Sequence, residues 1–484
     1  MNNQQQTSNG VNHWISRRHP RYVRSLVYML QASEYNIADF FKWHERVSDF
    51  RFVEKRKRLV FTPKAVVLLI AGWAGLCGAL VLAVLIFASA SSFWSYLLAL
   101  AVLFETPLIV LATLIFAVIV LRLLQLPAEA LLLAQAKRRL AAHRGIKIAV
   151  AGSFGKTSTR EILRTVLSER RKVAAPKDSY NTPLGIAKFV QSLKGDEEVL
   201  IFELGEYYPG DVHKLARVIS PDWGVITGVN EAHLEKFRSL ERTADTVFEL
   251  AESVQATHLY VNGESPLALA RVENGNIMYT REGAGIWNVA EARTSLSGTT
   301  FTMSDGKQSF EATSGLLGLH MLLPLALAAD MASRLGLKKE EIERGLAKTK
   351  PFAHRLEPKA WADGVTFLDD SYNGNPDGAR AVIAFLASLP GRRYYVTPGL
   401  VEAGPRQKEV HENIGVQIAD AGIEKVALIR NSVTPLIEDG LKKAGFKGNI
   451  LWYEDMPACL AALRALALPG DVILVQNDWP DQYT

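Results

Sequence analysis

The sequence predicts an α/β protein whose catalytic part follows two transmembrane helices. Residues 65–121, a stretch of 57, contain one charged side chain, Glu105. That length of apolar chain exceeds a soluble core helix and a signal peptide. Beyond it, a short strand, a glycine-containing loop and a helix follow one another at 146–167, and strand and helix patterns then alternate to the carboxyl terminus.

Composition excludes several classes of protein. The 484 residues are 48% hydrophobic and 22% charged, which is typical of a folded chain of about three domains at about 150 residues each. The two cysteines, Cys77 and Cys459, are too few for a disulfide framework or a four-cysteine zinc site. We therefore expect a reducing compartment.

The basic excess is confined to an amino-terminal arm, residues 1–60, which has 11 Lys/Arg against 5 Asp/Glu. Such an arm could bind nucleic acid, but the adjoining apolar stretch favours the anionic surface of a membrane. We expect membrane lipids as its partner and no nucleic acid. Within it, residues 21–52 read as one amphipathic helix, which either lies on lipid headgroups or packs on the soluble part.

Residues 61–126 form the predicted transmembrane hairpin, with spans at 65–88 and 93–121. Pro107, beside Glu105, can kink or divide the second span, which leaves a re-entrant geometry open. Glu105 is a functional intramembrane acid or, the favoured interpretation, a group paired near a kink. Basic residues stand only outside the two spans: Lys55, Arg56, Lys57, Arg58 and Lys64 before the first, and Arg122, Lys137, Arg138, Arg139, Arg144 and Lys147 after the second. Both termini should therefore be cytoplasmic, and residues 123–140 should be a helical connector.

The segment 146–167 predicts a phosphate-binding loop. A β run ending at Val150 precedes the loop, and a helical run from Arg160 to Leu167 follows it. Backbone N–H groups and the helix amino terminus would face phosphates, with a lysine to neutralise charge and a threonine to reach Mg²⁺. The usual pattern departs at its first glycine, where Val150 stands. The candidate nucleotide-binding residues are Gly152, Ser153, Gly155, Lys156, Thr157 and Ser158.

Two further clusters supply candidate metal ligands. A buried-type strand, residues 199–202, delivers Glu203, and a later strand leads to His233. An acid at the carboxyl end of a strand beside a phosphate-binding loop is well placed to hold a cation. Between the loop and this strand lies a third motif, Asn181 to Gly185. Taken singly, each of these residues is more often structural.

The last cluster comprises Phe352 to Glu357 and Phe367 to Pro376. With it, five ordered motifs across about residues 145–475 resemble the Mur ligase family, the ATP-dependent amide-bond-forming enzymes of peptidoglycan synthesis. The likeness is greatest to the family member that adds D-Ala-D-Ala. It implies a central ATP-binding domain at 140–350 and a Rossmann-like carboxyl-terminal domain at 351–484, both at the bacterial inner membrane.

The resemblance implies an ADP-forming reaction with ATP and Mg²⁺, in which a carboxylate becomes an acyl phosphate and an amine then attacks it. Lys156, His233, Glu203 and Arg355 would be catalytic. By motif, Thr157 with Glu203 would hold one Mg²⁺, His233 a second, and Lys156 the β/γ-phosphates. Asn181 would contact the γ-phosphate region, Arg355 and Asp370 the nucleotide, Asn373 the adenine, and Tyr372 and Asn375 the amine.

Departures from the family pattern point to altered substrate recognition. The membrane hairpin stands in place of the domain that holds the UDP-sugar. Val247 occupies the position of a lysine that is often carbamylated, and nearby Glu249 leaves a different balance of metal charge open. His320 to Pro324 replaces an asparagine-containing segment, and Gln476 to Pro480 replaces a Lys-Gly-Ser loop.

Three functions follow from these observations. The first, which the motifs favour, is addition of D-Ala-D-Ala or a similar amine to a muramoyl peptide carried on UDP or on a lipid. The second is a capsule ligase resembling poly-γ-glutamate synthase. The third is a membrane scaffold that binds nucleotide with little catalysis, and the full set of ion-handling residues argues against it. The segment Gly399 to Gly404 with His411 also resembles the dipeptide-adding enzyme, or it is an ordinary loop.

Overall fold

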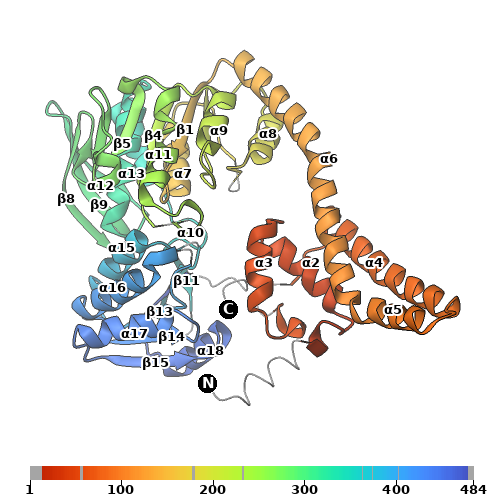
Figure 1. Ribbon diagram of the computed structural model, residues 1–484. Coiled ribbons are helices and arrows are strands. Elements are labelled where there is room, and N and C mark those ends of the chain that lie inside the picture. Colours follow the sequence, from red (N-terminus) through yellow and green to blue (C-terminus); the bar gives the residue numbers. More distant parts are fainter. Residues whose placement is uncertain are drawn as a thin grey trace. The chain divides into compact units, whose positions relative to one another are not determined.

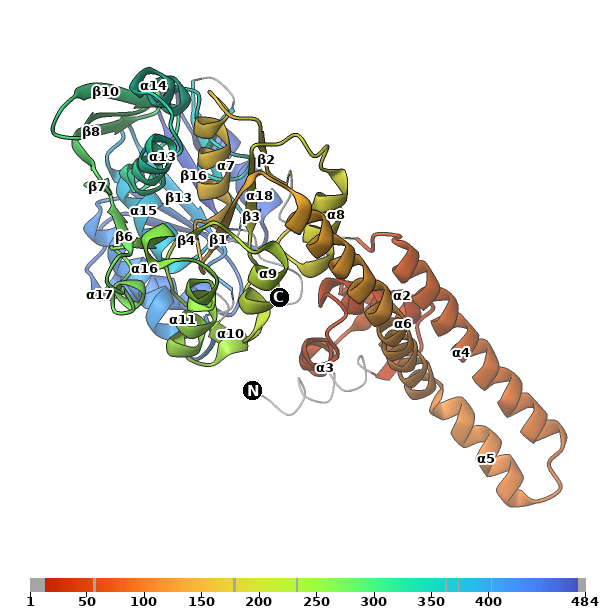
Figure 2. The ribbon, with the colours of Figure 1, turned by 90° about the horizontal axis from the view of Figure 1, so that it is seen from above.

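The computed structural model describes residues 14–54, 58–176, 180–231, 234–361, 364–372, 374–401 and 403–477. The chain divides into two compact units, which meet in sequence between Ala128 and Glu129. The first unit holds the arm and the apolar helices, and the second holds both predicted α/β domains (Figures 1 and 2).

The first unit is helical. Its elements are α2 (Tyr22–Ala32), α3 (Ile37–Arg46), the 3₁₀ turn η1 (Phe50–Phe52), α4 (Pro63–Ala88), α5 (Phe93–Phe104) and the first part of α6 (Thr106–Ala142). Of these, α4 and α6 are long and apolar enough to cross a membrane. The second apolar segment is divided as Pro107 indicated: Glu105 caps α5, and α6 starts at Thr106. Pro107 therefore lies in the first turn of α6, where a helix tolerates proline.

The arm differs from the single helix that its pattern predicts. Glu34 and Tyr35 have left-handed backbone angles, φ 52° and 60°, which end α2, and Asn36 then caps α3. The apolar side chains of α2, such as Leu26, are fully buried in a cluster shared with Leu68 of α4 and other residues of α4 and α6. This face therefore packs against the apolar helices instead of lying on headgroups or on the α/β part.

The second unit contains a ten-stranded sheet in the order β10-β9-β8-β7-β6-β5-β4-β1-β3-β2. Its strands are β1 (Ile146–Ala151), β2 (Val173–Ala174), β3 (Val199–Glu203), β4 (Trp223–Ile226), β5 (Leu259–Asn262), β6 (Ile277–Thr280), β7 (Gly283–Ala284), β8 (Trp287–Ser295), β9 (Gly298–Ser304) and β10 (Ser309–Ser314). Strands β1 to β6 pair in parallel, and β6 to β10 pair antiparallel. Because β1 lies between β3 and β4, the strand order reverses there, which opens a crevice at the carboxyl ends of these strands.

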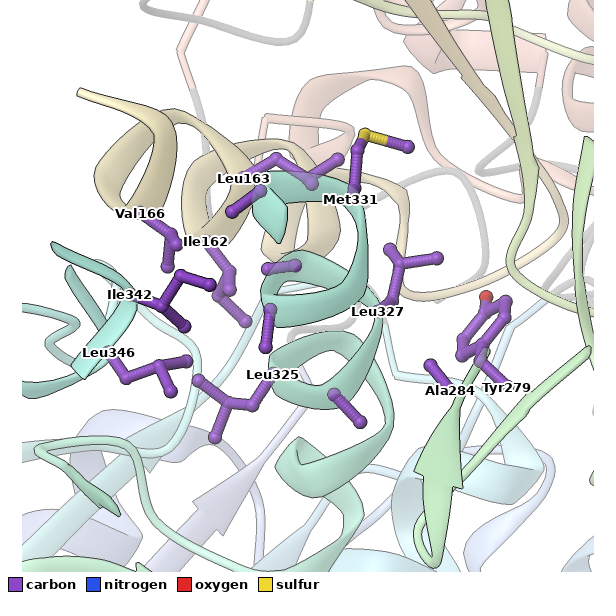
Figure 3. Packing of buried hydrophobic residues seen from close by; sticks show 14 of the residues in the cluster. Ile162, Leu163, Val166, Tyr279, Ala284, Leu325, Leu327, Met331, Ile342 and Leu346 are labelled. Atoms are coloured by element: carbon purple, nitrogen blue, oxygen red, sulfur yellow. The ribbon is translucent and has the colours of Figure 1, made fainter. Parts of the chain in front are cut away.

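Both faces of this sheet are covered. The successive β1 residues Ile148 and Ala149 belong to two different clusters of buried side chains, as expected of a parallel strand buried on both sides. In Figure 3, Ile162 and Val166 of α7 pack against the helix that carries Leu325. The helices and 3₁₀ turns are α7 (Lys156–Leu167), α8 (Pro183–Ser192), α9 (Asp211–Ile219), α10 (Leu234–Phe237), α11 (Leu240–Phe248), η2 (Ala251–Ser253), η3 (Ala256–His258), α12 (Pro266–Leu269), η4 (Leu319–Met321), α13 (Leu322–Arg334) and α14 (Lys339–Ala347).

The carboxyl-terminal domain has a six-stranded sheet in the order β11-β12-β16-β13-β14-β15, parallel except for β11. Its elements are β11 (Glu357–Ala360), β12 (Thr366–Asp370), α15 (Pro376–Ala387), β13 (Arg393–Thr397), η5 (Gly404–Arg406), α16 (Gln407–Asp420), β14 (Lys425–Ile429), α17 (Thr434–Lys443), β15 (Asn449–Tyr453), α18 (Met456–Leu466) and β16 (Val472–Gln476). The strand patterns that the sequence shows at residues 393–397, 425–430 and 471–476 are present as β13, β14 and β16. Both sheets therefore present the carboxyl ends of parallel strands, where loops carry functional groups.

The end of α6 belongs to the core of the second unit. Ala136 and Leu140 are buried there, and Arg139 donates to the Gln191 carbonyl at 3.2 Å. We expect a chain that begins at Glu129 to fold and bind ATP, and one that begins at Ala141 to lose about 2–4 kcal/mol of stability with these apolar groups. Denaturant unfolding and ATP titration check both. A folded 129–484 chain that fails to bind ATP would contradict the independence of this unit.

Candidate active site

The predicted phosphate-binding loop links β1 to α7. Its two glycines, Gly152 and Gly155, have φ angles of +140° and +73°, which glycine adopts without steric cost. A Cβ at Gly152 would also meet the Thr227 hydroxyl. Between them, Ser153 is buried and its hydroxyl has no partner among the described residues. The Ser153 hydroxyl, next to the amino terminus of α7, is therefore available to a phosphate bound at that terminus.

Glu203, at the end of β3, forms hydrogen bonds with two of the other predicted residues. Its carboxylate accepts hydrogen bonds from the Thr157 hydroxyl at 3.0 Å and from the Asn181 amide at 3.4 Å. The Arg160 guanidinium is 3.3 Å from the same carboxylate. Glu203 is 2% exposed, so a charge-compensated group is held inside the protein beside the loop. The structure thus brings together Thr157, Glu203 and Asn181, as the motifs predicted.

Lys156, the first residue of α7, is held by two acceptors. Its ammonium group donates to the Gly152 carbonyl, and to a carboxylate oxygen of Glu206 at 2.6 Å. Both the lysine and this acid are largely buried, with side-chain exposures of 11% and 1%. The lysine therefore stays next to the loop and does not extend into solvent.

A cavity of about 360 Å³ joins the loop to the carboxyl-terminal domain. Gly155 and Ser158 line it from one domain, and Arg355, Asp370 and Tyr372 line it from the other. The Arg355 guanidinium lies over the Tyr372 ring, 4.7 Å from its centroid. Burial lowers the pKa of Arg355, while Tyr372, Glu203 and Asp370 oppose that shift by their charge. Arg355 of the carboxyl-terminal domain thus lies close enough to Glu203 for their charges to interact.

Asp370 ends β12 and is half-buried in the wall of the cavity. Burial raises the pKa of its carboxyl group to about 7, against the opposing effects of the Leu356 N–H and the Arg355 charge. The Leu356 N–H donates to Asp370 at 3.0 Å. The folded protein therefore holds a proton here across a pH range in which the unfolded chain has lost it.

Asp370→Asn should change how stability depends on pH. Because the folded-state pKa of Asp370 is raised, its contribution is complete below about pH 4 and is lost as pH rises through about 7, by at most about 1.4 kcal/mol per pH unit. The asparagine variant lacks this loss, so its stability should gain on the wild type from pH 4 to pH 7. Urea unfolding at several pH values measures the difference, and parallel curves would contradict the assignment.

Two predicted site residues, His233 and Asn373, lie outside the described residues, as does Glu402 of the Gly399 to Gly404 segment. The two described residues that lead toward His233, Asn230 and Glu231, both contact the carboxyl-terminal domain. Asn230 donates to the Asn375 side chain at 2.9 Å, and Glu231 pairs with Arg406 at 2.6 Å.

Glu249, suggested to balance metal charge, and Asn375, suggested to contact the amine, both have structural partners. Glu249 accepts the N–H groups of Gly210 and His213 at 2.7 and 2.8 Å, so it caps α9 and does not balance charge at the loop. Val247 is fully buried in the core. Asn375 accepts the Gly378 N–H at 3.0 Å and caps α15.

Burial affects two histidines, His320 of a departing segment and His411 of the segment that resembles the dipeptide-adding enzyme. Burial lowers the pKa of His320, which lines the cavity, to about 4. Burial also lowers the pKa of His411, whose ring accepts the Leu400 N–H at 2.9 Å and contacts the Gln407 carbonyl at 2.6 Å. His411 therefore fixes the loop that starts at Gly399, which is a structural role.

Sequence reasoning missed two charged groups of the site, Arg160 and Glu206. Arg160 is one helical turn after Lys156 and 2% exposed, so a spacing of four residues could have placed it on the same face. Glu206 follows Glu203 by three residues across a glycine. That spacing has no regular structural meaning in a loop, and the fold alone reveals the contact.

Comparison with known proteins agrees with this geometry. Residues 150–332 match the Mur ligase middle domain, and residues 354–476 match the Mur ligase glutamate ligase domain. The chain is 29% identical over 364 residues to the UDP-N-acetylmuramoyl-tripeptide–D-alanyl-D-alanine ligase of Mycobacterium leprae, covering 68% of this chain and 70% of that one. It is 26% identical over 334 residues to the Bacillus subtilis enzyme of the same name, covering 68% and 72%.

Solved structures show the same fold. The MurF ligase from Thermotoga maritima, in complex with ADP, matches with a TM-score of 0.64 and 25% identity over 72% of this chain and 80% of that one. MurF from Acinetobacter baumannii matches with a TM-score of 0.66 and 20% identity over 73% and 78%. Both matched domains and the ATP-binding site they carry lead to one conclusion: the chain belongs to the Mur ligase family of ATP-dependent, ADP-forming ligases.

Proposed function

We propose that this enzyme joins D-Ala-D-Ala, or a similar amine, to a muramoyl peptide in peptidoglycan synthesis, through an acyl phosphate. One observation carries the proposal: Gly155 and Ser158, which flank Lys156 and Thr157 in sequence, line a cavity whose opposite wall supplies Arg355 and Asp370. The relatives named above are D-alanyl-D-alanine ligases by name, and the match covers 70% and 72% of their length. They support the choice of substrates.

The cations and N–H groups of this chain are suited to phosphoryl transfer. Lys156 and Arg355 would offset the charge that spreads over the transferring phosphoryl oxygens, and the amino terminus of α7 would bind the phosphates. Transfer of this kind depends chiefly on positioning and on electrostatic stabilisation. Because Arg355 comes from the carboxyl-terminal domain, the central and carboxyl-terminal domains together complete the site, and their contact would exclude water from it.

The residues present also fit a magnesium ion. The Thr157 hydroxyl and the Glu203 carboxylate lie 3.0 Å apart, and such oxygen groups are the ligands Mg²⁺ prefers. Thr157 and Glu203 would hold the ion, which would supply neutralising charge for the phosphates. His233 stays the predicted ligand of a second ion.

We further propose that the first unit anchors the enzyme in the bacterial inner membrane, with the catalytic domains and both termini in the cytoplasm. Large apolar side chains are exposed along α4, α5 and α6, among them Ile70 at 65%, Trp94 at 76% and Phe116 at 68%. A water-soluble surface seldom presents so much contiguous apolar area. The basic residues at both ends of the hairpin support this orientation.

Product mass spectrometry tests the reaction. The full chain in detergent would receive ATP, Mg²⁺, a muramoyl tripeptide on UDP or on lipid, and either D-Ala-D-Ala or L-Glu, with Lys156→Ala as the matched control. We expect a dipeptide adduct that the variant does not form, and the carrier that reacts identifies the acceptor. ATP binding with no adduct from D-Ala-D-Ala would overturn the proposal, and an adduct from L-Glu would indicate the capsule-type reaction.

A further inference from the structure

A second buried acid faces the phosphate-binding loop. Glu206 lies in the turn after β3, three residues beyond Glu203, and its side chain is 1% exposed. Gly205 fixes this turn: its N–H donates to the Asn181 carbonyl at 2.9 Å, and a Cβ at Gly205 would lie 2.7 Å from that oxygen. The turn therefore sets where Glu206 lies, and it directs the carboxylate to Lys156.

We propose that Glu206 is a positioning residue that orients Lys156 toward the phosphates of ATP. A lysine ammonium has three N–H donors and no acceptor. In this structure Gly152 and Glu206 accept two of them, which leaves the third for a phosphate oxygen. The two fixed acceptors restrict a side chain that otherwise has many rotamers, so the remaining donor is aimed before the nucleotide arrives.

The placement of this acid is costly unless it has such a role. A buried ion pair gains little net stability, since the desolvation of both charges offsets their attraction. A carboxylate beside a triphosphate site also repels the ligand. Glu203 already supplies one buried acid, paired with Thr157 and Arg160. Glu206 is a second buried acid, and it pairs with Lys156, the neighbour of Thr157. Its presence is therefore best explained by what it does for that lysine.

The inference rests on the proposed ATP site, and four variants separate it from that site. Glu206→Gln keeps an oxygen at the same reach but loses the charge. Glu206→Asp keeps the charge but withdraws the oxygen by one methylene. Glu206→Ala removes both. Glu252→Gln is the matched control, because Glu252 lies 46 residues further along, is 65% exposed and pairs with His213 on the surface.

The readouts are kcat and KM for ATP in the full chain, with ATP affinity by calorimetry. A positioning role predicts that Glu206→Asp and Glu206→Ala lower kcat about 10–100-fold while KM changes less than about threefold. Glu206→Gln should stay within about threefold of wild type, and Glu252→Gln should be unchanged. An equal or larger loss in Glu206→Gln than in Glu206→Asp would overturn the inference, as would wild-type kcat in Glu206→Asp. If the alanine variant does not fold, the Asp and Gln pair decides the matter alone.

A double variant distinguishes action through Lys156 from direct action on the nucleotide. In the Lys156→Ala background Glu206 has no lysine to orient, and it faces the phosphates as an acid without its ammonium partner. Adding Glu206→Ala should then leave ATP affinity unchanged or raise it. A further loss of affinity would contradict the inference. If Lys156→Ala alone leaves ATP affinity unaltered, the proposed ATP site itself is wrong.

Discussion

Lys156→Ala should lower the rate of ligation by about a thousandfold or more, which is the scale expected when a main cation is removed from a phosphoryl-transfer site. The reason is local: Lys156 opens α7, and its ammonium group is kept at the loop by Gly152 and Glu206. Without it, the loop loses this ammonium group, and Arg160, one helical turn away, is already paired with Glu203. Coupled measurement of ADP release and amide product at saturating ATP gives the rate.

Lys214→Ala is the matched control for this result, because Lys214 lies on the exposed surface of α9 in the same domain. It should retain wild-type turnover. Removing Lys156 leaves the Glu206 carboxylate buried without its ammonium partner, which should cost about 3–5 kcal/mol of stability. Turnover is therefore compared for protein that denaturant unfolding shows to be folded. Turnover that survives in Lys156→Ala at the wild-type rate would remove the proposed site.

Arg355→Ala should lower kcat/KM by about a hundredfold to a thousandfold, through loss of transition-state charge stabilisation. Arg355 lines the cavity from the carboxyl-terminal domain and contacts the Tyr372 ring. Its planar guanidinium offers two parallel N–H groups to a phosphate, a geometry that the ammonium group of lysine does not have. Arg355→Lys should therefore recover only part of the loss, and steady-state kinetics of the three proteins measures the order.

Arg344→Ala is the control for the arginine series. Arg344 is 56% exposed and pairs with Glu169 on the surface, a kind of pair that contributes about 0–1 kcal/mol. Its kinetics should match the wild type. Equal kcat/KM in Arg355→Lys and wild type would show that a point charge suffices and that the fork-like contact does not operate.

Much of the nucleotide site is predictable because its signals are local in sequence. A strand, two glycines, a lysine and a helix follow one another between Ile146 and Leu167, and the two glycines have the positive φ angles that the loop requires. Glu203 is predictable for a similar reason, since an acid at the end of a strand next to β1 must face the crevice. The structure places both as expected.

The remaining site residues depend on tertiary contacts. Glu206 reaches Lys156 only because Asn181 holds the intervening turn. His411 matches a motif of the dipeptide-adding enzyme, yet its ring is used by Leu400 and Gln407. A motif identifies a residue, whereas the partners of that residue, which determine its role, come from distant parts of the chain.

The apolar region shows the same contrast. Its length and the break near Pro107 were predictable from hydropathy and from the conformational limits of proline. The arm was not: its apolar spacing indicates one helix, but left-handed angles at Glu34 and Tyr35 divide it. Packing of α2 against Leu68 and the neighbouring apolar residues of α4 and α6 offsets the cost of that turn, and such packing has no signature in a local pattern.

Transfer of an oxygen isotope tests the central claim most directly. The terminal carboxylate of the muramoyl peptide would carry ¹⁸O, and the full chain would receive ATP, Mg²⁺ and D-Ala-D-Ala. If the carboxylate attacks the γ-phosphate, one labelled oxygen leaves with the phosphate when the amine displaces it. The account predicts one ¹⁸O in inorganic phosphate for each amide formed. Amide formation with unlabelled phosphate would contradict the acyl-phosphate route.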